Sequence, residues 1–314
     1  MKLSIIIVNW NTAELLRQCL NSFIKENICL PFEVIIVDNA SSDGSVKMIK
    51  NEFPDVYLIN NTSNLGFARA NNQAIRIAKG EYILLLNSDT IILNRLIFKH
   101  MADLMDLNPD AGVCGCRLIF PNGNHQVGDA GFKPSVQTVF NHAFFLSMFF
   151  PLSFNGLFLS YRKLSGIVEV DWISGAAFMV RRSILPDVGL LSEKTFMFAE
   201  DIEWGCRIRH YGYRILYMAD LEIVHLQGAS SKKQKNRHRF ALLWLKNLRE
   251  LYRSYNRAHP MVIYDLLFSI AFFLRCFVYV LLFHKTGQHI FKEKFRKMYA
   301  YLKYTLKNFG KHNK

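Results

Sequence analysis

The stretch of the sequence best suited to chemistry is a polar segment that directly follows an apolar run. The run Tyr82–Leu86 is typical of a buried strand, and residues 87–90, which follow it, read Asn-Ser-Asp-Thr. In an open α/β sheet, ligands bind just beyond the carboxyl ends of the strands. A carboxylate at Asp89 could hold a divalent cation on a diphosphate, because hard cations choose oxygen ligands. The alternative is that Asp89 caps a helix that starts near Asn94.

Acidic residues and a histidine later in the chain are further candidates for chemistry. Glu200, Asp201 and Glu203 stand at the start of a predicted helix, where the helix dipole favours anions. One of them could instead be a general base that accepts a proton from a hydroxyl group. His225 follows the predicted strand 221–224 and is soon followed by a glycine. That position suits a second metal ligand, although a lone histidine is more often structural.

Short apolar runs alternate with helical patterns over the first 110 residues or so. Continuous β-branched runs predict parallel core strands, and the segments between them have the apolar spacing of helices. The predicted strands are 3–8, 33–37, 56–60 and 82–86. The first predicted helix runs from an N-cap at Asn11 to about residue 25, and the others run from 67 to 79 and from about 94 to 107. This alternation argues for an α/β fold built on a doubly wound, mostly parallel sheet.

Three of the predicted strands end in small polar residues. Asp38 follows one strand, residues 60–64 end the next, and residues 87–89 follow the third. Since the carboxyl ends of parallel strands share one edge, a polar cleft is expected there. Such a cleft suits a nucleotide, with Asp38 accepting from a base or ribose and the backbone near Gly66 approaching the ligand. The alternative is that these are ordinary turns, which Asn, Ser, Asp and Gly favour in any case.

The middle of the chain offers apolar and small residues. The Phe-rich segment 143–159 is broken by Pro151 and Gly156, so it is too interrupted for a spanning helix. For this segment, hydrophobic packing is favoured over a groove for an acceptor lipid. Trp172 presents a flat face on which a sugar could stack, although a core position is an equal alternative. The small residues 174–177 would let a ligand approach the backbone.

Charge and cysteine content limit the classes of function. Hydrophobic residues make up 51% of the chain, which indicates contact with a membrane or another large apolar surface. Residues 1–231 carry 20 basic and 22 acidic residues, whereas 232–314 carry 19 and 3, so a near-neutral body precedes a basic tail. The six cysteines form no C-x-x-C pair, which favours free thiols in a reducing compartment over a zinc site. Neither a signal peptide nor a glycine-rich phosphate motif of ATPases or dinucleotide enzymes is recognisable, so we expect a cytoplasmic body.

The basic tail combines apolar stripes at helical spacing with positive charge. Residues 240–255 predict a basic amphipathic helix, with Arg249 in its basic stripe. The segment Met261–Phe283 is long enough to span a bilayer, but it contains Asp265 and Arg275, so an interfacial or embedded segment is favoured. We therefore predict two domains, 1–230 and 231–314, the second docked on an anionic inner leaflet. Nucleic-acid binding is the rival explanation for a basic tail, but continuous apolar stripes favour lipid.

Taken together, these segments resemble the inverting glycosyltransferases of family 2, which have the GT-A fold, and among them the bacterial rhamnosyltransferase-type members. The matching segments follow the family's order over residues 1–230, and they are SIIIVNWN (4–11), VDNASSDGS (37–45), NLGFARANNQAI (64–75), LLLNSDT (84–90), DWISGAAFMVRR (171–182), FAEDIEWGCRIRHYGYRI (198–215) and HLQGAS (225–230). The combination is specific, although no single segment is.

The resemblance implies a role for each matching residue. It makes Asp201 the catalytic base, and Asp89 and His225 the ligands of Mg²⁺ or Mn²⁺ on the diphosphate. The expected donor-binding residues are Asn9, Asn11, Asp38, Asn64, Gly66, Asn71, Asn87 and Ser88. The expected acceptor-binding residues are Trp172, Gly175, Ala176 and Glu200. Asn87 departs from the strict D-x-D motif of the family, which puts in doubt a ribose contact by a charged group there.

The resemblance also implies an enzyme that moves a sugar, with rhamnose as one candidate, from a dTDP- or UDP-sugar. The expected acceptor is a hydroxyl of a cell-envelope glycan or a polyprenyl-linked glycan. The expected location is the cytoplasmic face of the bacterial inner membrane, as a peripheral or monotopic protein without a nucleic-acid partner. One alternative is a nucleotidyltransferase, but residues 8–11 lack its glycine-rich phosphate loop. The other is a non-catalytic glycan- or lipid-binding scaffold, against which the retained Asp89, Asp201 and His225 argue.

Overall fold

The computed structural model describes residues 1–24, 29–150, 153–159, 164–194, 199–226, 237–255 and 260–311. The chain divides into two compact units. The first unit comprises Met1–Ala130 and Arg162–Gln234, and the second comprises Gly131–Tyr161 and Lys235–Lys314. This division differs from the predicted boundary near residue 230 in one respect. The segment Gly131–Tyr161, which the sequence placed in the first domain, clusters with the C-terminal helices.

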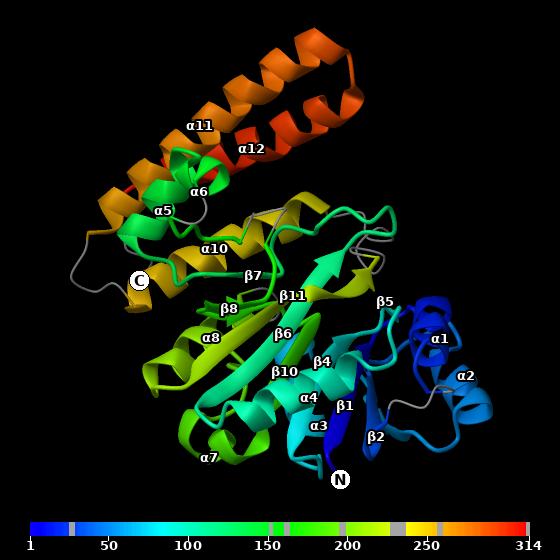
Figure 1. Ribbon diagram of the computed structural model, residues 1–314. Coiled ribbons are helices and arrows are strands. Elements are labelled where there is room, and N and C mark those ends of the chain that lie inside the picture. Colours follow the sequence, from blue (N-terminus) through cyan, green and yellow to red (C-terminus); the bar gives the residue numbers. More distant parts are fainter. Residues whose placement is uncertain are drawn as a thin grey trace. The chain divides into compact units, whose positions relative to one another are not determined.

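A nine-stranded sheet forms the centre of the first unit (Figure 1). In spatial order its strands are β3 (Tyr57–Asn60), β2 (Phe32–Asp38), β1 (Leu3–Asn9), β4 (Tyr82–Asn87), β10 (Ala177–Arg181), β6 (Ala111–Ile119), β11 (Arg214–His225) and β5 (Thr90–Ile92), with β8 (Ile167–Val170) paired to β11. Two further short strands are β7 (Ala130–Gly131) and β9 (Trp172–Ile173). The apolar side chains of β1 and β4 are buried on both faces of the sheet, as expected for parallel core strands.

The α/β class is confirmed, and the sheet is mixed in strand direction. The predicted strands β3, β2, β1 and β4 run parallel to one another. β10 is antiparallel to β4 and β6, and β11 is antiparallel to β5 and β8. The carboxyl ends of the parallel strands meet at one edge, because Asn9 lies opposite Asp38, and Val8 lies opposite Asn87. The predicted polar edge of the sheet is therefore present.

Helices of the first unit connect these strands. They are α1 (Ala13–Asn21), α2 (Ser45–Glu52), α3 (Phe67–Ile75), α4 (Ile97–Leu107), α7 (Leu185–Val188), which follows a short 3₁₀ helix (Arg182–Ile184), and α8 (Glu200–His210). The prediction that Asn11 caps the first helix is wrong, because Thr12 is the N-cap and Asn11 Oδ1 instead accepts from the Ser42 N–H at 2.7 Å. The alternative that Asp89 caps a helix is also wrong. Asp89 is followed directly by β5, and the N-cap of α4 is Leu96.

The second unit consists of helices. They are α5 (Val136–Ala143), α6 (Leu146–Phe149), α10 (Arg237–Tyr255), α11 (Met261–Thr286) and α12 (His289–Lys307). α11 and α12 lie side by side (Figure 1), and Gly287, with φ of 66°, ends α11 before the chain reverses. Arg275 of α11 donates to the carbonyl oxygen of His142 at 2.8 Å. This bond joins α11 to α5, in agreement with the grouping of Gly131–Tyr161 with the C-terminal helices.

A buried ion pair lies within the second unit. Arg249 Nε donates to Asp265 Oδ1 at 2.9 Å, and Arg249 Nη2 donates to Asp265 Oδ2 at 3.0 Å. Arg249 also donates to the carbonyl oxygens of Asn308 and Lys311 near the end of α12. The prediction that Arg249 belongs to the basic stripe of an amphipathic helix is therefore wrong, because Arg249 is buried and paired with Asp265. The predicted basic stripe also included Lys246, Arg253 and Arg257, of which Arg257 lies outside the described residues.

Apolar side chains remain exposed on the second unit. Phe149 is 67% exposed and Phe150 is 59% exposed, so the predicted hydrophobic packing of 143–159 is wrong for this part of the segment. Among the described residues, α11 is the one helix long and apolar enough to cross a membrane.

Candidate active site

Asp38 stands at the end of β2 in a network of buried polar side chains. Its Oδ2 accepts from Asn9 Nδ2 at 2.8 Å, and its Oδ1 accepts from the backbone N–H of Ser41 at 2.8 Å. The Thr12 hydroxyl donates to Asn9 Oδ1 at 2.7 Å and lies 3.0 Å from the Ser88 hydroxyl. The network joins the ends of β1 and β2 to the segment after β4. Asp38 is fully buried, and its two hydrogen bonds hold Asn9 and the Ser41 backbone at this edge of the sheet.

Rare backbone conformations gather at the same edge of the sheet. Asn11 and Ala40 have φ of 54° and 63°, and Gly66, just before α3, has φ of 82°. Positive φ values are uncommon for residues with side chains and concentrate at ligand sites. Asn64 Oδ1 accepts from the Gly66 N–H at 2.9 Å and so shapes the turn into α3.

Asp89 and His225 meet where β5 pairs with β11. Thr90 lies opposite His225 in this antiparallel pair. His225 Nε2 lies 3.1 Å from Asp89 Oδ1 and 3.2 Å from Asn87 Nδ2. The structure thus brings together the two predicted metal ligands and the first residue of the Asn-Ser-Asp segment.

These donor atoms fit a divalent cation. The ligands of octahedral Mg²⁺ lie about 2.0–2.1 Å from the ion, which places neighbouring ligands about 3 Å apart. The separation of Asp89 Oδ1 and His225 Nε2, 3.1 Å, matches that spacing. The described residues contain no cluster of three or more His, Cys, Asp or Glu side chains able to hold a metal. Any further ligands would therefore come from a bound diphosphate and water, which is usual for Mg²⁺.

Asp201 lies in the first turn of α8, against the turn that precedes β10. Its Oδ2 accepts from the Gly175 N–H at 3.0 Å, and its Oδ1 accepts from the Ile202 N–H at 2.8 Å. Ala199, the N-cap of α8, has φ of 68°, a second mark of strain at this site. A Cβ added at Gly175 would lie 2.8 Å from Phe67 Cζ, so a larger residue in this turn would require the Phe67 ring to shift.

Glu200 and Asp201 are neighbouring carboxyls with different surroundings. Burial, together with the charge of Asp201, raises the pKa of Glu200 to about 8. Glu200 Oε2 is buried without a hydrogen-bond partner in the described structure. Burial also raises the pKa of Asp201, although two backbone N–H groups stabilise its ionised form. Because Asp201 accepts from two backbone N–H groups and Glu200 Oε2 accepts from none, the charge is better stabilised on Asp201 than on Glu200. A raised pKa makes Asp201 a stronger base.

One short turn contacts both halves of the site. The Gly175 N–H donates to Asp201, and the carbonyl oxygen of the next residue, Ala176, accepts from the Asn87 N–H at 3.1 Å. The candidate base and the candidate metal segment are therefore fixed to adjacent residues of one turn.

Two of the predicted site residues, Trp172 and Asn71, are buried and contact the interior of the fold. Trp172 is 2% exposed, and a Cβ at Gly205 of α8 would lie 2.9 Å from its Cα, so the core alternative fits Trp172. Asn71 is buried, and its side chain donates to the carbonyl oxygen of Phe67 inside α3. Residue 198 of the acidic segment and residues 227–230 of HLQGAS lie outside the described residues.

Three site residues had no assigned role in the sequence. Ser41 and Thr12 complete the network around Asp38 and lie within or next to the matching segments. Gln126 contacts His225 from an irregular segment between β6 and β7. A lone glutamine in such a segment carries no pattern that predicts a contact with a residue so distant in the chain.

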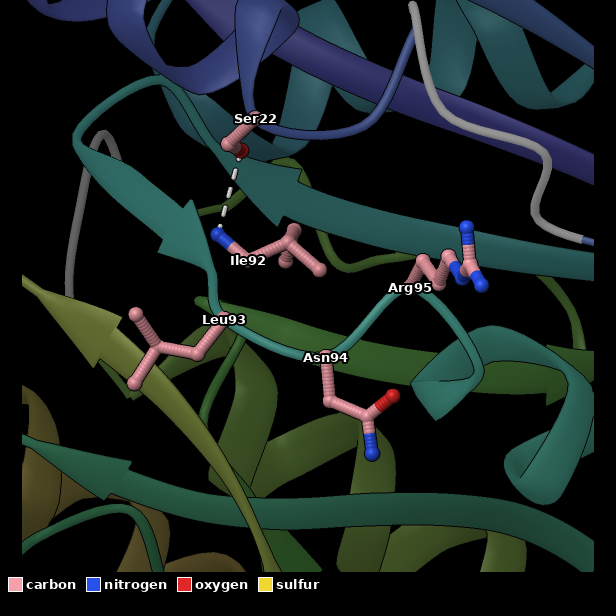
Figure 2. A pocket seen from close by; sticks show the side chains of 5 residues that line it. All are labelled: Ser22, Ile92, Leu93, Asn94 and Arg95. Atoms are coloured by element: carbon pink, nitrogen blue, oxygen red, sulfur yellow. Dashed lines mark hydrogen bonds between the residues drawn. The ribbon is translucent and has the colours of Figure 1, made fainter.

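A shallow hollow of about 360 Å³ lies beside the connection from β5 to α4 (Figure 2). It is lined by Ser22, Ile92, Leu93, Asn94 and Arg95. Ser22 Oγ accepts from the Ile92 N–H at 3.1 Å, a bond that ties α1 to β5. None of the predicted site residues lines this hollow, so it is separate from the chemistry described above.

Two curated relatives in sequence have names that describe glycan assembly. The chain is 27% identical over 220 residues to the N-acetylglucosaminyl-diphospho-decaprenol L-rhamnosyltransferase of Mycobacterium tuberculosis, a match that covers 66% of this chain and 71% of that protein. It is 25% identical over 235 residues to the O-antigen biosynthesis protein RfbC of Myxococcus xanthus, covering 74% of this chain but only 18% of the relative. The chain thus spans less than a fifth of the RfbC protein.

Solved structures share the fold. The mannosyltransferase PcManGT from Pyrobaculum calidifontis, in complex with GDP-Man and Mn²⁺, superposes with a TM-score of 0.60 at 16% identity, covering 98% of this chain and 86% of that one. TarS 1-349 of S. aureus superposes with a TM-score of 0.52 at 16% identity, covering 100% of this chain and 93% of that one. These likenesses confirm the GT-A fold. The family model described as glycosyl transferase family 2 matches residues 4–189, and the chain belongs to that family.

Proposed function

We propose that the chain is a metal-dependent inverting glycosyltransferase whose base is Asp201. The observation that carries the proposal is the turn at Gly175 and Ala176, whose backbone binds Asp201 on one side and Asn87 on the other. These two contacts support a site in which the proposed proton acceptor, Asp201, works beside the proposed diphosphate-binding segment. The nucleotidyltransferase and scaffold alternatives have no comparable observation in their favour.

The proposed reaction is a direct displacement. Asp201 takes the proton from the acceptor hydroxyl as its oxygen attacks the anomeric carbon, and the bond from that carbon to the diphosphate oxygen breaks. The nucleoside diphosphate leaves with the electron pair, so configuration inverts. A positioned general base contributes about 10²–10⁴-fold to such a step. The proton on Glu200 keeps a second negative charge away from Asp201.

Asp89 and His225 are the proposed ligands of Mg²⁺ or Mn²⁺. When bound, the ion neutralises the negative charge that develops on the departing diphosphate. The neighbouring polar edge, with Asn9, Asn11, Asp38, Asn64, Gly66, Asn71, Asn87 and Ser88, is the proposed donor-nucleotide site. Gly175, Ala176, Glu200 and Trp172 are the proposed acceptor side, with Trp172 supporting it from the core rather than by stacking.

The proposed substrates follow the chemistry named for relatives. The mycobacterial relative is a rhamnosyltransferase that acts on a diphospho-decaprenol glycan. We infer a dTDP- or UDP-sugar donor, with rhamnose as one candidate, and a polyprenyl-linked or cell-envelope glycan acceptor.

A donor panel tests the proposed function. The purified chain is given dTDP- and UDP-sugars with an N-acetylglucosaminyl-diphospho-polyprenol acceptor, and released nucleoside diphosphate is measured with Mg²⁺, with Mn²⁺ and with EDTA. We expect metal-dependent release with one donor and an inverted anomeric centre by NMR. Asp89→Ala should lose the metal-dependent part of the nucleoside diphosphate release. Retention of configuration, or metal-dependent release unchanged in Asp89→Ala, would contradict the proposal.

We also propose that the second unit binds the cytoplasmic surface of the bacterial inner membrane. Its lipid-facing surface consists of exposed apolar residues around α6 and on α11, namely Phe144, Met148, Phe149, Phe150, Leu266, Phe273, Phe277 and Leu281. α12 of the same unit adds exposed basic residues, which are Lys292, Lys294, Arg296, Lys297, Lys303 and Lys307. Apolar area combined with positive charge is the pattern that binds anionic bilayers. In the buried Arg249–Asp265 pair, the positive charge of Arg249 compensates the charge that would make Asp265 costly in lipid.

Vesicle sedimentation tests this surface. The full chain should partition to vesicles that contain phosphatidylglycerol and less to neutral vesicles. The double variant Phe149→Ser, Phe150→Ser should reduce partition. The matched control is Leu107→Ser, because Leu107 is 80% exposed on the first unit. Equal loss in both variants, or self-association of the chain instead of vesicle binding, would contradict a lipid-facing surface.

A further inference from the structure

Gln126 makes two contacts with His225. Its Oε1 lies 2.5 Å from His225 Nδ1, and its Nε2 donates to the backbone carbonyl oxygen of His225 at 3.5 Å. The second contact fixes which way the amide points, because only the NH₂ group can face a carbonyl oxygen. Gln126 Oε1 is therefore the atom that faces the ring. Gln126 is 3% exposed, so water does not compete for this acceptor.

The orientation of Gln126 determines where the imidazole proton lies. An amide oxygen accepts, so the proton of neutral His225 must be on Nδ1. Nε2 then presents its lone pair toward Asp89 Oδ1 at 3.1 Å and can accept from Asn87 Nδ2 at 3.2 Å. Two acceptors, Nε2 and Oδ1, thus face each other in a partly buried space. A cation between them would turn this unfavourable pair into two ligands.

The backbone around His225 is held independently of Gln126. The Leu226 N–H donates to the carbonyl oxygen of Asp89 at 2.9 Å, and β5 pairs with β11 up to His225. Loss of the Gln126 side chain therefore leaves the position of His225 in the strand and removes the constraint on its ring.

We propose that Gln126 is a positioning residue that holds His225 in the Nδ1–H tautomer, with Nε2 ready for a divalent metal. The inference rests on the proposed metal site and adds a residue that acts through His225. Hydrogen-bond partners of a ligating histidine fix its tautomer and ring orientation, and their loss typically costs about 10–100-fold in metal affinity.

Metal binding and nitrogen NMR test the proposal without any turnover measurement. Mn²⁺ alone is titrated into the purified full chain, and free Mn²⁺ is followed by EPR. Gln126→Leu removes the acceptor and should weaken Mn²⁺ binding about 10–100-fold. Gln126→Glu keeps an oxygen against Nδ1–H but loses the NH₂ group that faces the His225 carbonyl oxygen, so it should weaken Mn²⁺ binding less than Gln126→Leu does. Gln73→Leu is the matched control, because Gln73 pairs with Asn61 through a similar part-buried amide contact.

The ¹⁵N shifts of the metal-free protein report the tautomer directly. We expect the His225 signal, assigned by its loss in His225→Gln, to show a protonated Nδ1 in wild type and a tautomer mixture in Gln126→Leu. A wild-type ring protonated on Nε2, or unchanged Mn²⁺ affinity in Gln126→Leu, would overturn the role of Gln126. If Asp89→Ala also leaves Mn²⁺ affinity unchanged, the metal site itself fails. If Asp89→Ala weakens Mn²⁺ binding and Gln126→Leu does not, the metal site stands and only the positioning role of Gln126 is refuted.

Discussion

Two buried carboxyl groups, Asp265 in the second unit and Glu200 in the first, have opposite surroundings. Asp265 accepts two N–H groups from Arg249 and one from the Gly310 backbone. Glu200 Oε2 is buried with no hydrogen-bond partner in the described structure, and its nearest charge is the like charge of Asp201. Removing one partner of a compensated buried charge destabilises a fold, whereas a buried acid without compensation has a shifted pKa.

The Arg249–Asp265 pair connects helices, whereas the Glu200–Asp201 pair has the shifted pKa values expected of groups that take part in chemistry. Arg249 joins α10 to α11 and to the end of α12 through one guanidinium, so three helices depend on it. The Glu200–Asp201 pair instead stands at the start of α8 beside a strained residue, Ala199. The comparison predicts that the first pair responds to mutation in stability and the second in pH dependence and rate.

The largest stability effect is expected for Arg249→Met. The change leaves the Asp265 carboxylate buried without its cation, which typically costs about 3–5 kcal/mol. Chemical denaturation in detergent or lipid should show this loss in the free energy of unfolding. The double variant Arg249→Met, Asp265→Leu should recover much of it, because no charge remains buried. If Arg249→Met is as stable as wild type, Arg249 is not needed to compensate the buried charge of Asp265.

A smaller, pH-dependent effect is expected for Glu200→Gln. The pKa of Glu200 is raised from 4.5 to about 8, so between these pH values the folded chain holds a proton that the unfolded chain has lost. The free energy of unfolding of wild type should therefore fall as pH rises through this window, with a slope of at most about 1.4 kcal/mol per pH unit. Glu200→Gln cannot titrate, and its stability should be flatter with pH. If the free energy of unfolding changes equally with pH in both proteins, Glu200 is not the source of the pH dependence.

The smallest effect is expected for an exposed ion pair. Lys99 and Asp103 lie 2.5 Å apart on α4, and both side chains are more than 40% exposed. Solvent-exposed pairs of this kind contribute about 0.3–0.5 kcal/mol on a helix. Lys99→Met should therefore change the unfolding free energy by no more than that amount in the same denaturation experiment. A loss as large as that of Arg249→Met would remove the distinction between buried and exposed pairs.

The sequence predicted those parts of the fold that depend on local pattern. The runs at β1, β2 and β4 and the polar residues that follow them were recognisable because a buried parallel strand is apolar on both faces. Asp89 and His225, to which the family resemblance assigns metal binding, lie 3.1 Å apart. The roles of these residues in catalysis and metal binding remain predictions.

The parts that failed depend on contacts between distant segments. Periodicity assigned Arg249 to the basic stripe of a helix, because nothing near it in sequence reveals that Asp265 pairs with it. The Phe-rich segment 143–159 was expected to pack, but α6 leaves Phe149 exposed. The contact of Gln126 with His225 could not be predicted either, since it spans most of the middle of the chain.

The most direct test of the central claim is the transfer rate of Asp201→Asn. The variant retains the shape of the side chain and can still contact the Gly175 turn, but it cannot accept a proton. With the donor and acceptor identified by the panel, its turnover should fall by about 10²–10⁴-fold while donor binding is preserved. Turnover close to that of wild type would contradict the assignment of Asp201 as the base.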